Sequence, residues 1–215
     1  MHYIEKRRDI IRFACAMHSD RLTVANSGNI SERTAEGFLV TPSGVLYEDL
    51  EPDNIVHLDY HGHCISGDLA PSSEWKIHAD IYRSRPEVNG IVHAHSPSAT
   101  ALSTLRQPVP AFHYMISVAG GSHIPCADYA TFGTQALSDN VIRAMTGFKA
   151  CLMANHGMVA TGSSLKAAYT LALEIESLCE QYSKARQLGE VCLLTEDEIA
   201  EARAAFAVYG QKNVK

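Results

Sequence analysis

The sequence predicts an α/β protein built as one domain that spans residues 1–215. Its 215 residues suffice for one large domain or two small ones, and its 46% hydrophobic content is that of an ordinary globular protein with a sizeable core. Segments with helical and with strand character are mixed along the chain. Because no repeat, low-complexity tract or linker separates them, we expect one compact body.

The N-terminal half begins with a predicted helix and continues with two strands and a second helix. Apolar residues near helical spacing predict a helix over residues 4–18. The runs "GFLVTP" and "NIVHLD" are short, rich in β-forming residues and bounded by turn residues, which predicts strands within 37–42 and 54–59. The stretch "PSSEWKIHADIYRSRPE" opens with capping serines and closes before Pro86, so we expect a helix over 74–84 with Glu74 in its first turn.

The C-terminal half has the same mixture of elements. Apolar residues at alternating spacings of three and four predict a long amphipathic helix over residues 163–187. The other expected elements are a strand over 88–95, helices over 96–105 and 133–145, two strand segments within 149–162 about a turn at His156–Gly157, and a last helix over 195–208.

Charge and composition exclude several classes of protein. Lys and Arg number 18 against 24 Asp and Glu, giving a net charge of -6, and no basic cluster suits nucleic-acid phosphates. No stretch has the length of a membrane span, and the N-terminus lacks the apolar centre of a secretory signal. The six cysteines are scattered without CxxC spacing, so we interpret them as reduced, mostly buried thiols. We therefore expect a cytoplasmic protein that binds neither nucleic acid nor membrane.

Two histidines at the end of the apolar run "VNGIVHAHSPSAT" are the first candidate metal ligands. In a strand, residues i and i+2 point to the same face, so His93 and His95 project side by side and can share one ion. A second HxH pair, His61 and His63, lies around a glycine and among polar residues, which is typical of a hairpin tip. We expect the first pair, and not the second, to bind metal.

A catalytic zinc site with an open position for substrate uses three protein ligands. His156 follows an apolar strand and precedes a glycine that leaves room for a close approach, which makes it the best third candidate. Glu74 and His78 lie four residues apart on one predicted helix and could both face the site. Spacing alone does not choose between these two.

Three short polar segments, "NSGNIS", "TPSGV" and "PSSE", are interpreted as turns rich in Gly, Ser and Asn. Their backbone amides and hydroxyls, together with a helix N-terminus, make an uncharged cradle that suits a phosphate. A divalent metal, a carboxylate and a phosphate cradle together indicate sugar-phosphate chemistry through an enediolate.

The pattern "GNIS... TPSG... PSSEW... HAH... NHG" resembles the class II aldolase/adducin family over nearly the whole chain. This resemblance implies a three-layer α/β/α fold with a mainly antiparallel sheet, a homotetramer, and one Zn2+ per chain held by His93, His95 and His156. It places Glu74 at the family's catalytic carboxylate, which also ligates zinc in the resting enzyme. His78 then becomes a structural residue or a neighbour of the ligands.

The resemblance also implies positions that bind substrate. The family's phosphate site corresponds here to Gly28, Asn29, Ser43, Gly44, Ser72 and Ser73. Tyr114 matches a catalytic tyrosine that reaches the active site of a neighbouring subunit, where it would hydrogen-bond the C4 oxygen. Phe132 and Tyr209 match residues near the aldehyde end of the substrate.

Two longer stretches, "AFHYMISVAGGSHIPCADYATFGT" and "FAVYG", are most similar to the branch of the family that cleaves L-fuculose 1-phosphate. The expected activity is therefore zinc-dependent cleavage of that sugar phosphate to dihydroxyacetone phosphate and L-lactaldehyde. A related 4-epimerase typically has aspartate where this chain has Glu74, and a sugar-phosphate decarboxylase or dehydratase is a further alternative. Adducin-like members are non-enzymatic interaction modules, and the complete His and Glu set argues against that reading.

Overall fold

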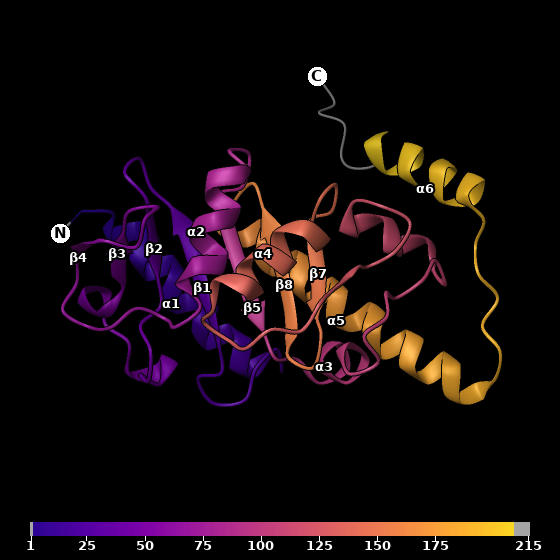
Figure 1. Ribbon diagram of the computed structural model, residues 1–215, viewed down its shortest axis with the longest axis horizontal. Coiled ribbons are helices and arrows are strands. Elements are labelled where there is room, and N and C mark those ends of the chain that lie inside the picture. Colours follow the sequence, from indigo (N-terminus) through magenta and orange to yellow (C-terminus); the bar gives the residue numbers. More distant parts are fainter. Residues whose placement is uncertain (1, 209–215) are drawn as a thin grey trace, which may run out of the picture.

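The computed structural model describes residues 2–208 and places an eight-stranded sheet at the centre of the molecule (Figure 1). The strand order is β4-β3-β2-β1-β5-β8-β7-β6, and every neighbouring pair is antiparallel except β6 with β7. The strands are β1 (Gly28–Arg33), β2 (Phe38–Val40), β3 (Val56–Leu58), β4 (Cys64–Ser66), β5 (Gly90–Ala94), β6 (Cys126–Ala127), β7 (Ala150–Met153) and β8 (Gly157–Gly162). The expectation of an α/β fold with a mainly antiparallel sheet is confirmed.

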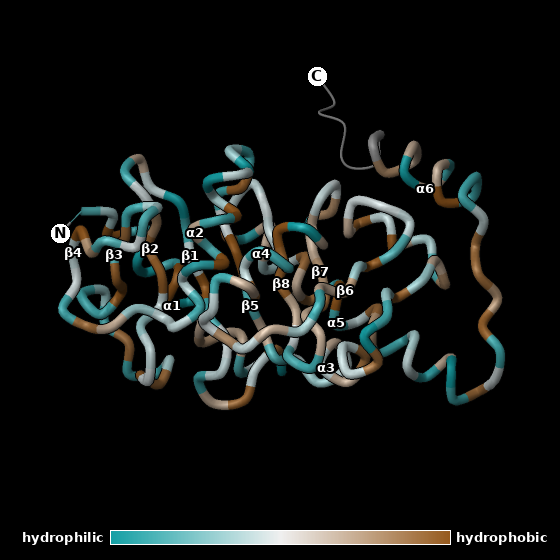
Figure 2. Tube along the Cα trace, in the orientation of Figure 1, coloured by the Kyte–Doolittle hydropathy of each residue, from teal (hydrophilic) through white to brown (hydrophobic). Residues whose placement is uncertain are grey.

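Helices cover both faces of this sheet. They are α1 (Ile4–Ser19), α2 (Trp75–Ser84), α3 (Pro97–Ser103), α4 (Gln135–Ala144), α5 (Leu165–Leu188) and α6 (Glu196–Val208), with short 3-10 turns η1 (Tyr47–Asp49), η2 (Pro52–Asn54) and η3 (Tyr114–Ala119). One core cluster joins α1, α3 and α5 to the sheet, and a second joins α2 and α4 to its other face. Hydrophobic residues run along the strands and hydrophilic ones along many of the connecting loops (Figure 2).

The alternation of side chains along a strand decides which face of the sheet each residue points to. On β5, Ile91 belongs to the cluster under α2 and α4, whereas Val92 belongs to the cluster under α1, α3 and α5. His93 follows with the same parity as Ile91, so its side chain lies on the α2 side. The helix that carries Glu74 at its start thus covers the face from which His93 projects.

Most of the predicted elements are confirmed, with two corrections near the site. The segment "NSGNIS" was interpreted as a turn, but Gly28 begins β1, which pairs along its length with β5. The sequence looks like a turn because it is rich in polar residues, but Asn29 and Ser31 are buried in β1 with their side chains hydrogen-bonded. Glu74 is the N-cap of α2 and precedes its first turn. The pair His61 and His63 does lie at the turn of the β3–β4 hairpin.

The C-terminal helix α6 lies at the end of the molecule away from β4, after an extended segment that follows α5 (Figure 1). It packs against η3, where the rings of Tyr114 and Phe206 stack with centroids 5.8 Å apart. Leu194 in the connecting segment donates its backbone N–H to the carbonyl oxygen of Ala111 at 2.8 Å.

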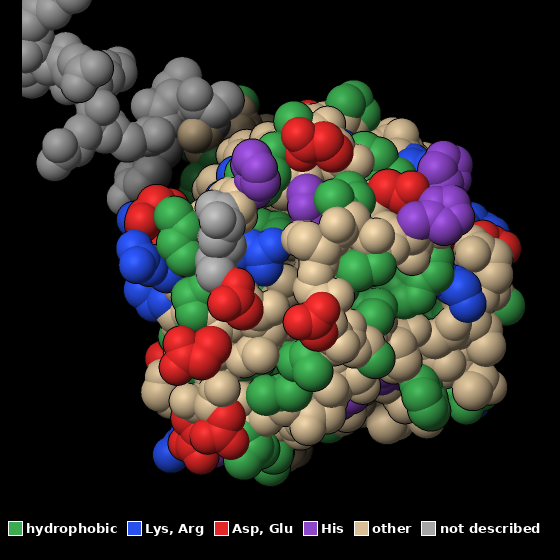
Figure 3. All heavy atoms as spheres, turned by 90° about the vertical axis from the view of Figure 1, so that its left-hand side faces the viewer, with side chains coloured by type: hydrophobic (Ala, Val, Ile, Leu, Met, Phe, Trp, Pro, Cys, Tyr) green, Lys and Arg blue, Asp and Glu red, His purple; other side chains and the backbone are tan. Residues whose placement is uncertain are grey.

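Of the helices described, none combines the length and apolar character needed to span a bilayer. Figure 3 shows the end of the molecule that carries the N-terminal strands, where acidic and basic side chains are interspersed among polar and apolar ones. This face therefore has no continuous basic surface of the kind that binds nucleic-acid phosphates.

Candidate metal centre

Three imidazoles and one carboxylate converge at one edge of the sheet. His93 is the second-to-last residue of β5, His95 directly follows the strand, His156 lies in the turn between β7 and β8, and Glu74 caps α2. Their ligand atoms all lie within 4.8 Å of one another, and this is the one such group within residues 2–208. The three rings form a nearly equilateral triangle with centroids 4.8, 4.9 and 4.9 Å apart.

The pairing of β5 with β8 brings the histidines together. Ala94 pairs with Met158, which places the end of β5 beside the β7–β8 turn that carries His156. Gly157 makes this approach possible, because a Cβ added there would lie 2.4 Å from the carbonyl oxygen of Ala94 and 3.0 Å from Cδ2 of His95. The expectation that a glycine after His156 permits a close approach is therefore confirmed.

Two of the three histidines are in the protonation state that suits metal binding, whereas for His93 burial lowers the pKa but the charge of Glu74 outweighs burial and raises it. His93 donates from Nδ1 to the carbonyl oxygen of Met158 at 2.8 Å, which directs Nε2 toward the centre, 2.9 Å from Nε2 of His95. Burial, together with the charge of His93, lowers the pKa of His95 to about 3 and that of His156 to about 4. Both rings are thus neutral near pH 7, which is the form that binds metal.

The two oxygens of Glu74 have different surroundings. Oε2 accepts a hydrogen bond from Nδ2 of Asn29 at 3.1 Å and lies 3.0 Å from Nε2 of His93. Oε1 lies 3.3 Å from Nε2 of His156 but accepts no hydrogen bond from any described residue, although it is buried. Burial raises the pKa of this carboxyl, but the charge of His93 and hydrogen bonds from His93 and Asn29 outweigh burial and lower the pKa overall. Glu74 is therefore ionised near neutral pH.

These residues fit a divalent metal ion. A buried carboxylate oxygen without a hydrogen-bond donor is costly unless a cation approaches it. Three imidazoles with one carboxylate are a donor set that zinc accepts, and imidazole nitrogens bound at about 2.0 to 2.1 Å around one zinc lie roughly 3.3 Å apart. His93, His95, His156 and Glu74 would hold the ion.

The structure separates these ligands from the other candidate histidines. His61 and His63 lie on an exposed turn, and His63 donates from Nδ1 to Asp59 at 2.8 Å instead of joining a metal-binding group. His78 is fully buried on α2, where it bonds to Asn29 and Ser31. Glu74 and not His78 therefore faces the centre, which resolves the alternative that sequence spacing left open.

A cavity of about 520 Å³ opens beside the metal ligands. Its lining includes all six residues predicted to bind phosphate, namely Gly28, Asn29, Ser43, Gly44, Ser72 and Ser73. Ser72 and Ser73 precede α2, so the positive end of that helix points into the cavity, where it favours an anion. The carboxamide of Asn29 is engaged with Glu74 and His78, so its side chain is oriented toward the carboxylate.

The predicted residues of the aldehyde end are placed differently. Phe132 lines the same cavity and is 64% exposed, so it can contact a ligand or a neighbouring chain. Tyr114 is 51% exposed, stacks on Phe206, and does not line the cavity of its own chain. Tyr209 lies outside the described residues.

Several cavity residues are not among the predicted site residues. Two of them, Tyr129 and Asn155, line the same cavity as His156. Asn155 has a positive φ of 54° and accepts a hydrogen bond from Nε of Arg106 at 2.7 Å, and that guanidinium lies 5.7 Å from the centre of the Tyr129 ring. The position of Asn155 beside His156 in "NHG" is the signal that could have identified it.

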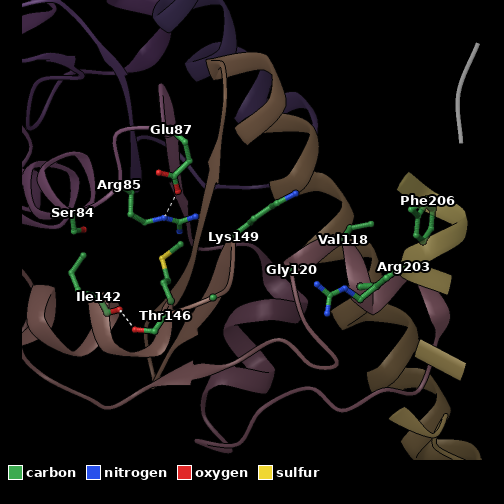
Figure 4. A pocket seen from close by; sticks show the side chains of 13 residues that line it. Ser84, Arg85, Glu87, Val118, Gly120, Ile142, Thr146, Lys149, Arg203 and Phe206 are labelled. Atoms are coloured by element: carbon green, nitrogen blue, oxygen red, sulfur yellow. Dashed lines mark hydrogen bonds and ion pairs between the residues drawn. The ribbon is translucent and has the colours of Figure 1, made fainter. Parts of the chain in front are cut away.

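A separate cavity of about 800 Å³ lies among α2, α4, η3 and α6 (Figure 4). Its single carboxylate, Glu87, is paired with Nε of Arg85 at 2.9 Å, and its other charged residues are Lys149 and Arg203. It therefore lacks the combination of imidazoles and a free carboxylate found at the metal centre.

The fold and this site together define a metal-dependent lyase. A profile described as the Class II Aldolase and Adducin N-terminal domain matches residues 8–183. The chain belongs to the class II aldolase and adducin family, and it is an aldolase within that family.

Its relatives carry two kinds of name. The 5-methylthioribulose-1-phosphate/5-deoxyribulose-1-phosphate aldolase of Rhodospirillum rubrum is 45% identical over 207 residues, covering 96% of this chain and 93% of the relative. The L-fuculose phosphate aldolase of Escherichia coli O6:H1 is 43% identical over 204 residues, covering 94% of each. A solved structure of an L-fuculose 1-phosphate aldolase superposes with a TM-score of 0.91 at 35% identity, covering 94% of this chain and 96% of that one.

Proposed function

We propose that this chain, as one catalytic domain, is a zinc-dependent aldolase that cleaves a ketose 1-phosphate between C3 and C4, and that its substrate is L-fuculose 1-phosphate. The products are dihydroxyacetone phosphate and L-lactaldehyde. The observation that carries the proposal is a group of three histidines and a carboxylate, of which His95, His156 and Glu74 line one cavity together with a small polar cradle at a helix N-terminus.

Each group has a role in this reaction. Hydroxyls and amides at Ser43, Gly44, Ser72 and Ser73 hold the phosphate away from the bond that breaks, so binding energy orients the substrate. His93, His95 and His156 would hold the zinc ion, with Glu74 as a further ligand before substrate binds. When bound, zinc supplies Lewis-acid stabilisation of the negative charge that develops on the three-carbon fragment.

Glu74 handles the proton at C3. In the cleavage direction the C4 hydroxyl loses its proton, the electrons of the C3–C4 bond pass to the three-carbon fragment, and C3 is then protonated. In cleavage the ionised carboxylate takes up the proton that the C4 hydroxyl releases and delivers it to C3, and in the condensation direction it accepts the C3 proton and gives it to the C4 oxygen. Its Oε1 accepts no hydrogen bond from the described residues, so this atom would be an ion ligand before substrate binds and the proton carrier once substrate takes its place.

The C4 oxygen needs a separate hydrogen-bonding group. Tyr114 does not line the cavity of its own chain, and its exposed ring is available to a second chain. We propose that the protein is a homotetramer in which Tyr114 serves the neighbour's site, close to Phe132 and Tyr209 at the aldehyde end.

A second substrate has a specific observation in its favour. The 45% identical relative from Rhodospirillum rubrum is named for 5-methylthioribulose 1-phosphate and 5-deoxyribulose 1-phosphate. Cleavage of either between C3 and C4 releases the same dihydroxyacetone phosphate, with methylthioacetaldehyde or acetaldehyde in place of L-lactaldehyde. The proposed phosphate and metal contacts serve all three substrates, and only the aldehyde end distinguishes them.

The test is release of dihydroxyacetone phosphate from each of these three ketose 1-phosphates by purified, zinc-loaded protein. We expect cleavage with the highest kcat/KM for L-fuculose 1-phosphate. A higher value for either ribulose derivative transfers the assignment to that substrate. Failure to release dihydroxyacetone phosphate from any of them refutes the proposed reaction, and interconversion of C4 epimers of a pentulose 5-phosphate would identify an epimerase instead.

A further inference from the structure

A chain of buried polar side chains leads from Glu74 into the core. Asn29 donates from Nδ2 to Oε2 of Glu74 at 3.1 Å, and its Oδ1 lies 2.5 Å from Nε2 of His78. Nδ1 of His78 lies 2.6 Å from Oγ of Ser31, which lies 2.8 Å from the hydroxyl of Tyr82. All five residues are buried, and His78 and Ser31 have no exposed surface.

The chemistry of the groups fixes the direction of every hydrogen bond in this chain. A carboxylate only accepts, so the amide nitrogen of Asn29 faces Glu74 and its oxygen faces His78. Nε2 of His78 must then carry the proton, and burial lowers the pKa of His78 to about 3, so the ring is neutral and its Nδ1 accepts from Ser31. The hydroxyl of Tyr82 donates in turn to Ser31. All donors therefore point toward the carboxylate.

We propose that His78 is a positioning residue for the aldolase reaction, which locks the Asn29 amide against Oε2 of Glu74 and thereby leaves Oε1 as the oxygen that reacts. The inference rests on the proposed function, because it assigns a task to each oxygen of the same carboxylate. A flipped Asn29 amide would direct its oxygen at Oε2, repel the carboxylate and free it to rotate.

The asymmetry of the carboxylate supports this proposal. Oε2 is held by Asn29 and lies near His93, whereas Oε1 accepts no hydrogen bond within the described part of the chain. A buried histidine elsewhere in the chain provides a comparison. This residue is His57, which lies on β3 outside the catalytic cavity, and its Nε2 bonds to Oγ1 of Thr34 at 2.9 Å.

The test compares three variants of the full-length protein. His78→Leu removes the donor to Asn29, and His78→Gln keeps an N–H donor at a similar distance from the backbone. His57→Leu is the matched control, because it removes a buried imidazole that bonds to a hydroxyl elsewhere. Zinc affinity is measured by chelator competition with the metal alone, and kcat and KM are measured on the zinc-loaded proteins.

We expect His78→Leu to bind zinc about 10- to 100-fold more weakly and to lose kcat by a similar factor, with KM nearly unchanged. His78→Gln should recover most of both losses, and His57→Leu should match the wild-type zinc affinity and turnover per folded molecule. Equal zinc affinity and equal kcat in His78→Leu and His57→Leu would overturn the proposal and leave His78 a packing residue.

Ser31→Ala keeps the test decisive if His78→Leu does not fold. It deletes one oxygen of the chain and should weaken zinc binding in the same direction, so an unchanged affinity also overturns the proposal. If the wild-type protein cleaves no ketose phosphate, the proposed function fails, while the zinc affinities of these variants still decide whether the chain positions Glu74.

Discussion

Replacing Gly157 by alanine should displace the metal ligands, although Gly157 itself binds no metal. The added Cβ would lie 2.4 Å from the carbonyl oxygen of Ala94, and ordinary contact begins at 3.4 Å, so the ends of β5 and β8 must separate by about 1 Å. His95 directly follows Ala94, and His156 directly precedes Gly157. A misplacement of about 1 Å can cost roughly 100-fold in rate, and forcing a methyl group into a packed region typically costs about 1 to 3 kcal/mol of stability.

Gly162→Ala is the matched control at the other end of β8. A Cβ there would lie 2.4 Å from the backbone nitrogen of Ala168, which is an equally severe clash far from the metal ligands. Both variants are compared by denaturant unfolding, zinc affinity and release of dihydroxyacetone phosphate. We expect similar losses of stability but weaker zinc binding and slower turnover in Gly157→Ala alone. If both variants keep wild-type zinc affinity and turnover, the close approach at Gly157 does not set the ligand geometry.

Three further experiments test the assigned roles. His93→Ala should lose most of the bound zinc, which is expected at about one ion per chain, whereas His61→Ala should retain it; elemental analysis that finds full zinc in His93→Ala refutes the ligand assignment. Ser72→Ala should raise KM with little change in kcat, and steady-state kinetics with an unchanged KM would place the phosphate elsewhere. Glu74→Gln should lower kcat by about 10²- to 10⁴-fold, and Tyr114→Phe should also be nearly inactive. When the two variants are mixed and exchange subunits, activity should rise well above the sum of the activities of the two parents. No recovery despite proven exchange would mean that Tyr114 does not act on a neighbour's site.

The sequence predicted the metal centre well because its determinants are local. His93 and His95 share a face by strand alternation alone, and the glycine after His156 marks the close approach of two strands. Periodicity likewise predicted α5 within one or two residues at each end. The resemblance to the family then predicted Glu74 as a fourth member of this metal-binding group.

Other features depend on contacts between distant segments. Residues 26–31 resemble a turn in sequence, yet the segment from Gly28 onward forms β1 because β2 and β5 pair with it on both sides. Asn29 lines the cavity, as predicted for a phosphate-binding residue, but its hydrogen bonds to Glu74 and His78 join residues more than 40 positions apart, which no local sequence pattern indicates. β6 has only two residues and was missed because so short a strand has no periodicity.

Removal and return of zinc tests the central claim most directly. Wild-type protein is stripped with a chelator, its zinc content is verified, and release of dihydroxyacetone phosphate from L-fuculose 1-phosphate is measured before stripping, after stripping and after zinc is returned. Lewis-acid stabilisation is worth several kcal/mol, so the stripped protein should retain less than about 1% of the initial rate, and zinc should restore it. Undiminished cleavage by protein that is verifiably free of metal would contradict the account.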